Sequence, residues 1–257
     1  MNMAIQWVSF KTIVVKEVRR FMRIWVQTLV PPAITIALYF VIFGSLIGSR
    51  IGQMGGYDYM QFVVPGLIMM AVIQNSYGNV VSSFYGTKFQ GNIEELLVSP
   101  TAEVTILLGY LAGGVLRGLA VGGIVTLLAL FFTDLSVESW PITISMVLMT
   151  AVVFSIAGFL NAMYANSFDD ISIIPTFVLT PMIYLGGVFY SVDLLPDFWA
   201  KVSLANPILY MVNGFRYGIL GVSDVSLGVS YFMLTLFMLG GFGFAMYLLT
   251  RGEKLRS

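Results

Sequence analysis

Long stretches without any charged residue alternate with short polar segments along this chain. Five such stretches lie at 24–49, 59–87, 139–168, 171–192 and 225–250. A hydrocarbon core about 30 Å thick is crossed by roughly 20 apolar residues at helical rise, so each stretch is long enough to span a membrane. The composition, with 58% hydrophobic and only 10% charged residues, also indicates an all-α membrane protein.

A sixth span is predicted where the apolar run Ile106–Phe132 contains a single charge, Arg117. An arginine inside a bilayer costs about 2.5–3.5 kcal/mol unless it reaches water or a partner, and we expect this one to extend to the nearer interface. Pro31 and Pro32 are expected to bend the first span. The six predicted spans are 25–48, 59–84, 104–132, 140–165, 171–190 and 227–250.

Basic residues gather at the two ends of the chain. Eight of the thirteen Lys and Arg residues flank the first and last spans: Lys11, Lys16, Arg19, Arg20, Arg23, Arg251, Lys254 and Arg256. By the positive-inside rule both termini are cytoplasmic, which requires an even number of spans. Residues 1–24 also place aromatic and basic side chains on different helical faces, which predicts an interfacial amphipathic helix. A cytoplasmic extension of the first span is the alternative.

Two residue types that support much protein chemistry are absent, since the chain contains no Cys and no His. Disulfides, thiol nucleophiles, imidazole catalysis and the usual zinc or haem ligands are therefore excluded. An intramembrane enzyme is disfavoured, because Tyr57-Asp58 matches only half of an aspartyl protease site. Gly86-Thr-Lys88 lacks the upstream glycine of a phosphate-binding loop. We expect no catalytic residue, no metal site and no cofactor in this chain.

The loop after the second span is expected to be a short cytoplasmic helix at 91–99. Asn92 suits an N-cap, and Glu95 stands at the spacing of a capping box. Glu94 and Glu95 make the loop acidic, which suits contact with a protein better than contact with anionic lipid. A plain solvated turn is the alternative.

Two polar or broken regions are candidates for a transport pathway. Gln74 and Asn75 begin a polar half of the second span, which lines either a pathway or ordinary contacts between helices. Residues 191–220 are too apolar for a loop and too interrupted for a span. They predict two short helices that enter the outer leaflet and return between spans five and six. Helices that rest on the outer surface are the alternative.

Two segments resemble the type 2 ABC transporter permeases. One is Gly91-Asn-Ile-Glu-Glu-Leu-Leu-Val-Ser-Pro100, which is similar to the coupling helix of that family. The other begins at Leu179-Thr-Pro-Met-Ile-Tyr-Leu-Gly-Gly-Val-Phe-Tyr190 and continues through Leu194-Leu-Pro196, Asn206-Pro-Ile-Leu-Tyr210 and Phe215-Arg216. The resemblance covers essentially the whole chain and is closest to short permeases of the bacterial inner membrane.

The resemblance implies an exporter in which two copies of this chain form the pathway and two separate ABC ATPase subunits bind ATP and Mg. The residues implied to contact the ATPase are Asn92, Ile93, Glu94, Glu95, Leu96 and Leu97. The residues implied to form the pathway or outer gate are Pro181, Tyr184, Gly186, Gly187, Phe189, Tyr190, Pro196, Asn206, Pro207 and Arg216. Gln74 and Asn75 join them as candidate pathway residues because of the polar pattern of the second span.

The substrate is expected to be a lipid, a drug-like amphiphile or another hydrophobic compound. Export of a polysaccharide or lipid-linked glycan by the same mechanism is an alternative, and a passive channel or scaffold is another. Membrane lipid is an expected partner and nucleic acid is not.

Overall fold

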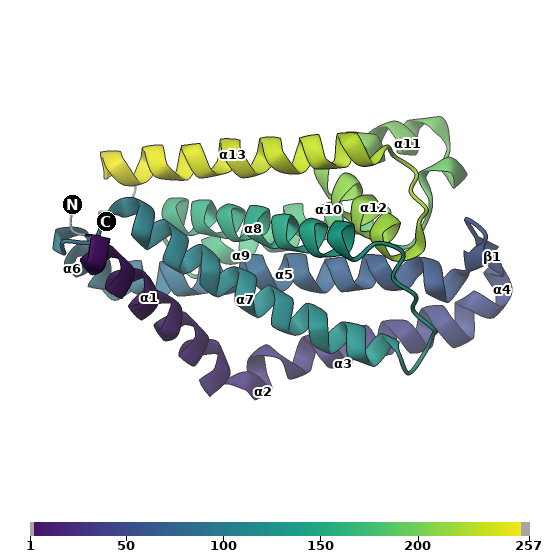
Figure 1. Cartoon of the computed structure of the whole chain (residues 1–257), viewed down its shortest axis with the longest axis horizontal. Helices are drawn as coiled ribbons and strands as arrows, with labels where there is room; N and C mark the ends of the chain where they lie inside the picture. Colours follow the sequence, from purple (N-terminus) through teal and green to yellow (C-terminus); the bar gives the residue numbers. More distant parts are fainter. Residues whose placement is uncertain (1–2, 253–257) are drawn as a thin grey trace.

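The computed structural model describes residues 3–252, apart from the side chains of residues 45 and 49, and these residues are almost entirely helical (Figure 1). The basic residues Lys254 and Arg256 lie outside the described residues. The elements are α1 (Met3–Arg23), α2 (Trp25–Thr28), α3 (Val30–Phe40), η1 (Val41–Gly48), α4 (Ser49–Ile51), β1 (Gln53–Met54), β2 (Tyr57–Asp58), α5 (Tyr59–Phe89), α6 (Asn92–Val98), α7 (Glu103–Ala129), α8 (Trp140–Tyr164), α9 (Asp170–Ile174), η2 (Pro175–Leu179), α10 (Thr180–Tyr184), η3 (Val192–Leu194), α11 (Asp197–Leu204), α12 (Pro207–Leu220) and α13 (Leu227–Arg251).

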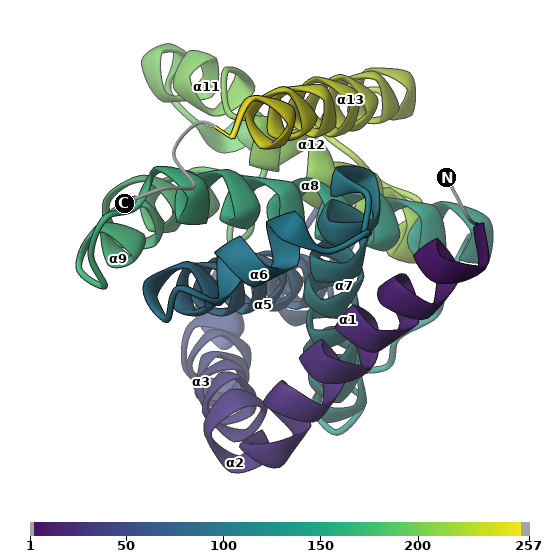
Figure 2. The same cartoon turned by 90° about the vertical axis from the view of Figure 1, so that its left-hand side faces the viewer.

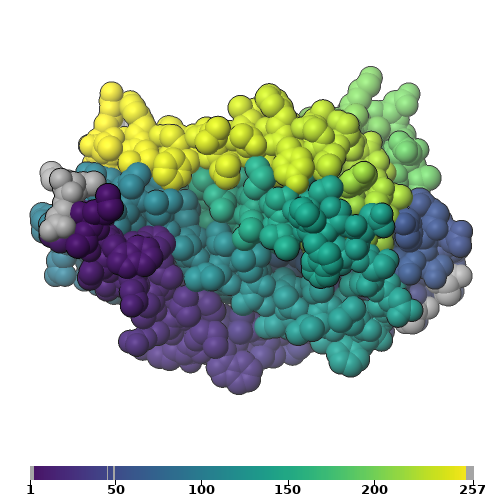
Figure 3. Space-filling view, in the orientation of Figure 1, coloured from purple at the N-terminus to yellow at the C-terminus, as the bar shows by residue number. Residues whose placement is uncertain are grey.

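The long helices form a bundle with α5 at its centre. α5 packs against α7, α8 and α12, and most of its residues are buried. α13 lies on one side of the bundle, where it packs against α8 and α12, and α1 to α3 lie on the opposite side (Figure 2). The space-filling view shows α13 along the upper edge, α1 at the left and the α2–α3 region along the lower edge (Figure 3).

The two ends of the bundle differ in what they carry. One end holds α6, the start of α1 and the end of α13, and we call it the α6 end (Figure 1). The other holds the antiparallel β1–β2 hairpin, α4 and α11, and we call it the hairpin end. The first and last described residues thus lie at the same end.

α1 is a separate helix that meets α3 at a sharp angle (Figures 1 and 2). The helix breaks at Ile24 and again at Leu29. The Thr28 hydroxyl donates to the Phe21 carbonyl (2.9 Å) and stabilises this corner. Pro31 lies in the first turn of α3, where its missing N–H leaves no helical hydrogen bond unmade. α1 is therefore not a straight extension of the first span.

Within residues 3–252, four helical segments are both long and apolar enough to cross a membrane: Trp25–Gly48, Glu103–Ala129, Trp140–Tyr164 and Leu227–Arg251. α5 is longer than any of them but is not among these four, because polar residues in its second half lower its hydropathy. The segment Asp170–Tyr184 is apolar but shorter. These two are the remaining candidates for the six predicted spans.

π-helical turns interrupt two of the apolar segments. η1 occupies the second half of the first segment, and η2 begins at Pro175 between α9 and α10. A π-helical turn widens the hydrogen-bonding pattern locally and is frequent at functional sites. η2 lies beside the face of α5 on which Gln74 is exposed.

Candidate functional site

α6 begins with a sharp backbone turn that differs from the predicted cap. Gly91 adopts a left-handed conformation (φ 75°) and occupies the N-cap position. Because the turn falls on Gly91, Asn92 becomes the first helical residue, and its amide donates to Gln90 (3.2 Å). The predicted capping box between Asn92 and Glu95 is therefore wrong. A glycine is the residue that adopts this conformation without strain, which the helix pattern alone did not reveal.

The six residues predicted to contact an ATPase divide between the two faces of α6. Ile93 is buried (2% exposed) and fixes α6 to the rest of the bundle. Leu96 and Leu97 are half-buried against the core. The remaining three residues, which are Asn92, Glu94 and Glu95, are exposed. α6 thus offers an acidic outer face on a firm apolar base.

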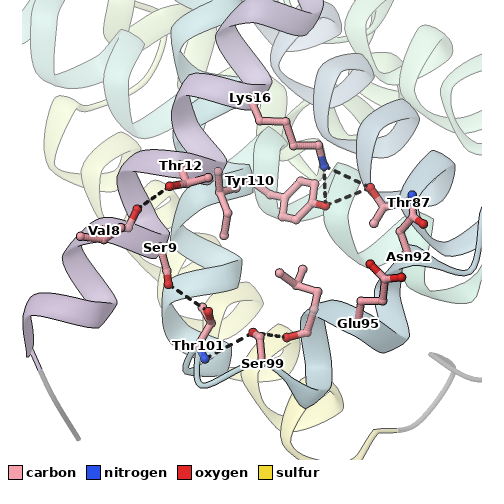
Figure 4. A pocket seen from close by; sticks show the side chains of 12 residues that line it. Val8, Ser9, Thr12, Lys16, Thr87, Asn92, Glu95, Ser99, Thr101 and Tyr110 are labelled. Carbon is pink, nitrogen blue, oxygen red and sulfur yellow. Dashed lines mark hydrogen bonds between the residues drawn. The ribbon is translucent and has the colours of Figure 1, made fainter.

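A cavity of about 410 Å³ separates α6 from α1 (Figure 4). Its walls come from α1, α6 and the facing ends of α5 and α7, and several residues that line it carry hydroxyl groups. Lys16 extends into it and lies 3.3 Å from the Tyr110 hydroxyl and 3.4 Å from the Thr87 hydroxyl. Glu95 stands on the opposite wall (Figure 4). The cavity therefore carries both signs of charge, together with hydroxyl groups, on a largely apolar lining.

The start of α1 is fastened to the corner between α6 and α7. The Gln6 side chain donates to the Pro100 carbonyl (2.8 Å) and accepts from the Ala102 backbone N–H (2.9 Å). It also accepts from the Thr105 hydroxyl (2.8 Å). These bonds satisfy backbone groups at the start of α7 that have no helical partner.

A buried carboxylate joins α1 to α5 and was not predicted from the sequence. The Glu17 side chain is fully buried and accepts from Arg20 (3.3 Å), from Ser83 (2.5 Å) and, at 3.5 Å, from Asn79. Arg20 in turn donates to the Asn79 side chain (2.7 Å). Gly113 of α7 allows this approach, because a Cβ there would lie 2.6 Å from the Glu17 Cβ.

The signal for Glu17 was present in the spacing of α1. Ile13, Glu17 and Phe21 recur every four residues, and all three are buried. The sequence interpretation assigned α1 an aromatic face and a basic face and overlooked this third stripe. A carboxylate on an otherwise apolar stripe predicts a buried partner.

Gln74 and Asn75 are neighbours in the sequence but have different surroundings. Gln74 is exposed and lines a cavity of about 250 Å³ with residues of η2 and α10. Asn75 is buried and accepts from Arg117 (3.3 Å). Arg117 also lies 3.5 Å from the Thr28 carbonyl. The guanidinium of Arg117 is thus held by protein groups, and only Gln74 remains on an open face.

Arg216 is the centre of the hairpin end. It is fully buried and donates to the Gly187 carbonyl (2.6 Å), the Phe62 carbonyl (3.2 Å) and the Asn213 side chain (3.4 Å). Its guanidinium lies 3.9 Å from the centre of the Phe62 ring. Gly187 has a positive φ of 70°, which turns the chain so that its carbonyl meets Arg216.

Other predicted gate residues join α10, α11 and α12 by contacts that do not include Arg216. Asn206 caps α12 by accepting from Ile208 N–H (3.0 Å) and also donates to the Met182 carbonyl (2.6 Å). Tyr190 is within 3.0 Å of the Ser203 hydroxyl. Pro207 begins α12, whereas Pro196 is exposed at the start of α11 and joins none of these contacts.

An aromatic cluster connects the first apolar segment to α10. The hydroxyls of Tyr39 and Tyr184 are 2.8 Å apart. Phe189 stacks on Tyr184 (5.7 Å between ring centres) and lies 4.7 Å from the Phe43 ring. Gly186 and Pro181 lie in the same segment, Gly186 buried and Pro181 exposed. Tyr39 and Phe43 were not predicted, because their span showed no polar interruption.

Among the described residues no group of three or more metal-ligating side chains comes together. Near the α6 end, the Asp170 side chain accepts from the Asn166 backbone N–H (2.9 Å) and the Ser167 backbone N–H (3.1 Å). These two bonds hold the start of α9 to the loop that follows α8. The group is a structural one at the start of α9.

Comparison with known proteins identifies relatives over most of the chain. A family model described as ABC-2 type transporter matches residues 8–220. The inner membrane transport permease YadH of Escherichia coli (strain K12) is 58% identical over 255 residues, which cover 99% of this chain and 100% of that protein. Nodulation protein J of Sinorhizobium fredii (strain NBRC 101917 / NGR234) is 24% identical over 177 residues, 67% of this chain and 66% of that protein.

Proposed function

The chain belongs to the ABC-2 type transporter family, and we propose that two copies of it form the pathway of an exporter driven by two separate ATPase subunits. As a member of this family it is a multi-pass transport permease of the inner membrane. Permeases of the family are generally not catalytic, so ATP and Mg are assigned to the partner subunit.

The observation that carries the proposal is the exposed acidic face of α6 on its buried base. Glu94 and Glu95 are exposed, while Ile93 beneath them is buried in the core. A force on the exposed face would therefore be passed to α5 and would not simply bend a loop. The second anchor is Gln6 of α1, which holds the chain directly after α6. Such a surface suits a protein partner that moves.

Pairing of two copies is supported by the open face between α3 and α9. In the most apolar stretch of the segment Trp25–Gly48, only 12% of the residues are buried inside the protein. The Phe177 side chain of η2 is 73% exposed. Gln74 lies on the same face, and a polar side chain in hydrocarbon requires a partner helix or water. A second copy that covers this face would supply both. Gln74, Tyr184 and the neighbouring aromatic residues would then border the pathway.

The positions of the chain ends and of basic residues indicate which end of the bundle faces the cytoplasm. We assign the α6 end to the cytoplasm, since the first and last described residues lie there (Figure 1). The basic residue Arg251 ends α13 at this end, and Arg19, Arg20 and Arg23 lie on α1, which begins there. α5 and the Asp170–Tyr184 segment complete six spans. The hairpin end, with α11 and α12, is then the outer gate. The open face between α3 and α9 is largely uncharged, and the substrate proposed for it is a lipid or another amphiphile.

The test is copurification of the tagged permease from bacterial membranes in mild detergent, followed by measurement of the mass of the complex. We expect two permease chains with two ATPase chains. A partner surface complementary to the acidic face of α6 would be basic, so lysine at positions 94 and 95 would place like charges in the interface. Such a change costs several kcal/mol, and replacing Glu94 and Glu95 with lysine should reduce the recovered ATPase by roughly tenfold or more. The permease pair should persist in that variant.

A matched control is Glu103→Lys, which reverses an exposed acid in the first turn of α7. ATPase recovery should be unchanged by this control. A parent chain that purifies without any nucleotide-binding subunit would favour a channel or scaffold. Undiminished ATPase recovery with the two lysines would exclude α6 as the contact.

A further inference from the structure

A lysine at the end of α5 holds the end of a different helix. The Lys88 ammonium donates to the Met163 carbonyl and to the Ala165 carbonyl, both at 2.9 Å. These carbonyls belong to the last turn of α8, where backbone acceptors have no helical donor. A cation is favoured at that position by the helix dipole as well. Lys88 lies only four residues before α6 begins.

Aromatic packing reinforces the same joint. The Phe168 ring, in the loop after α8, lies 5.0 Å from the Tyr85 ring and 4.9 Å from the Phe89 ring. Both partners are on the last turns of α5. The last turn of α8 and the loop at 165–169 are therefore attached to the α5–α6 corner by two charge-assisted hydrogen bonds and by ring contacts.

The loop is also firmly connected to the segment that follows it. Asp170 accepts two backbone hydrogen bonds from the loop, and Asn161 of α8 donates to the Ile171 carbonyl (3.3 Å). α9 continues directly into η2 and α10, where Thr176 and Thr180 line the cavity shared with Gln74. A continuous set of contacts thus leads from the α6 corner to the face proposed as the pathway.

We propose that Lys88 is a positioning residue that transmits movement of α6 to the α9–α10 segment. The inference rests on the proposed function, in which an ATPase moves α6. Movement of the corner would displace the two carbonyls that Lys88 holds, and with them the start of α9. The alternative route through α5 alone would move α9 only by the few direct contacts between these helices. The joint therefore predicts that docking of the ATPase and response of the pathway are separable.

The experiment uses the complex of permease and its copurified ATPase, and it exploits the natural absence of cysteine from the chain. Thr176→Cys is labelled with an environment-sensitive fluorophore, which reports on η2 at the cavity. The signal is compared without nucleotide and after trapping with ATP and vanadate. The same samples are analysed for the amount of ATPase bound to each permease.

Lys88→Met in the labelled chain should bind the ATPase as well as the parent does. Its fluorescence response should fall at least about fivefold, the lower limit of typical coupling between two sites. Lys88→Arg should retain more than half of the response, because a guanidinium can also donate to two carbonyls. Lys11→Met is the matched control, an exposed lysine on α1, and should leave both measurements unchanged.

Three other results would overturn the inference. Normal docking with a full response in Lys88→Met would exclude this role for Lys88 and leave the proposed function intact. Absence of any ATPase from the parent would overturn the proposed function and this inference together. If Lys88→Met fails to assemble, Phe168→Ala weakens the same joint from the loop, and an undiminished response in that docked variant would contradict the proposal.

Discussion

The bundle can be divided into the half toward the α6 end (the α6 half) and the half toward the hairpin end (the hairpin half). Among the described residues each half buries one charged side chain, and the partners of the two charges differ. Glu17 is held by side chains of α1 and α5, namely Arg20, Asn79 and Ser83. Arg216 is held mainly by backbone carbonyls, those of Phe62 and Gly187. Among the described residues no carboxylate lies within 4.0 Å of Arg216, whereas Glu17 has two basic groups within that distance.

This difference indicates which half can change its shape. Side chains such as Arg20 can rotate to new partners, so a network made of them can persist while α1 and α5 shift. Backbone carbonyls are fixed by the fold, and a guanidinium that binds two of them holds α5 and the turn at Gly187 in one arrangement. We infer that the contact of α1 with α5 in the α6 half is adjustable and that the core of the hairpin half is rigid.

The largest expected effect is that of removing the buried cation. Arg216→Met leaves the Gly187 carbonyl without its 2.6 Å donor and removes the contact with the Phe62 ring. We expect the free energy of unfolding to fall by about 3 kcal/mol. In detergent this should lower the apparent melting temperature by roughly 6–12 °C for a chain of this size.

Two variants test whether charge or shape is responsible. Arg216→Lys keeps the charge but loses the planar arrangement of donors, and about half of the destabilisation should remain. Arg50→Met removes an exposed arginine near the same end and should leave the melting temperature unchanged. Equal melting temperatures for Arg216→Met and Arg50→Met would contradict a structural role for Arg216.

A smaller effect is expected at Glu17. Glu17→Gln retains the size of the side chain and weakens its bonds to Arg20 and Ser83, so the free energy of unfolding should fall by about 1.5 kcal/mol. Part of the loss is screened, because the Arg20 side chain is 26% exposed. The expected fall in melting temperature is about 3–6 °C, with Glu103→Gln as the exposed control.

A double-mutant cycle examines the pair directly. Arg20→Gln and Glu17→Gln should be non-additive by at least about 0.5 kcal/mol, as residues in one network are. Additive losses would show that the ion pair between Glu17 and Arg20 contributes no stability of its own. The comparison between the two halves would then lose its basis in charge.

Much of the architecture could be predicted from the sequence because it depends on charge-free runs and local spacing. The four long apolar segments and α6 follow from such patterns. The capping of α6 could not be predicted correctly, since Asn92 and Gly91 both suit a cap and only the three-dimensional turn selects between them. The break between α1 and α3 depends on Thr28 meeting Phe21, a contact that no periodicity encodes.

The candidate site was harder to predict because its members come from distant elements. The motif at 179–216 contains Arg216 and Gly187 but says nothing of Phe62, which contributes both a carbonyl and a ring. Likewise Glu17 and Ser83 are 66 residues apart in the sequence. Polarity inside a span identified Gln74 and Asn75 together, yet helix rotation separates them onto an open and a buried face.

The smallest expected difference, about 1 kcal/mol, is that between two glycines that allow close packing in the two halves. A Cβ at Gly66 would lie 2.7 Å from the Val188 carbonyl oxygen, whereas a Cβ at Gly113 would meet the Glu17 side chain. The Glu17 Cβ can move away only together with α1, which lies at the edge of the bundle (Figure 2), whereas Val188 is fully buried in the core. Gly66→Ala should therefore cost about 2 kcal/mol and Gly113→Ala about 1 kcal/mol. Gly123→Ala meets nothing within 4 Å and should be neutral or slightly stabilising. Thermal unfolding of the three variants ranks them, and a greater loss at Gly113 than at Gly66 would place the rigid half at the α6 end.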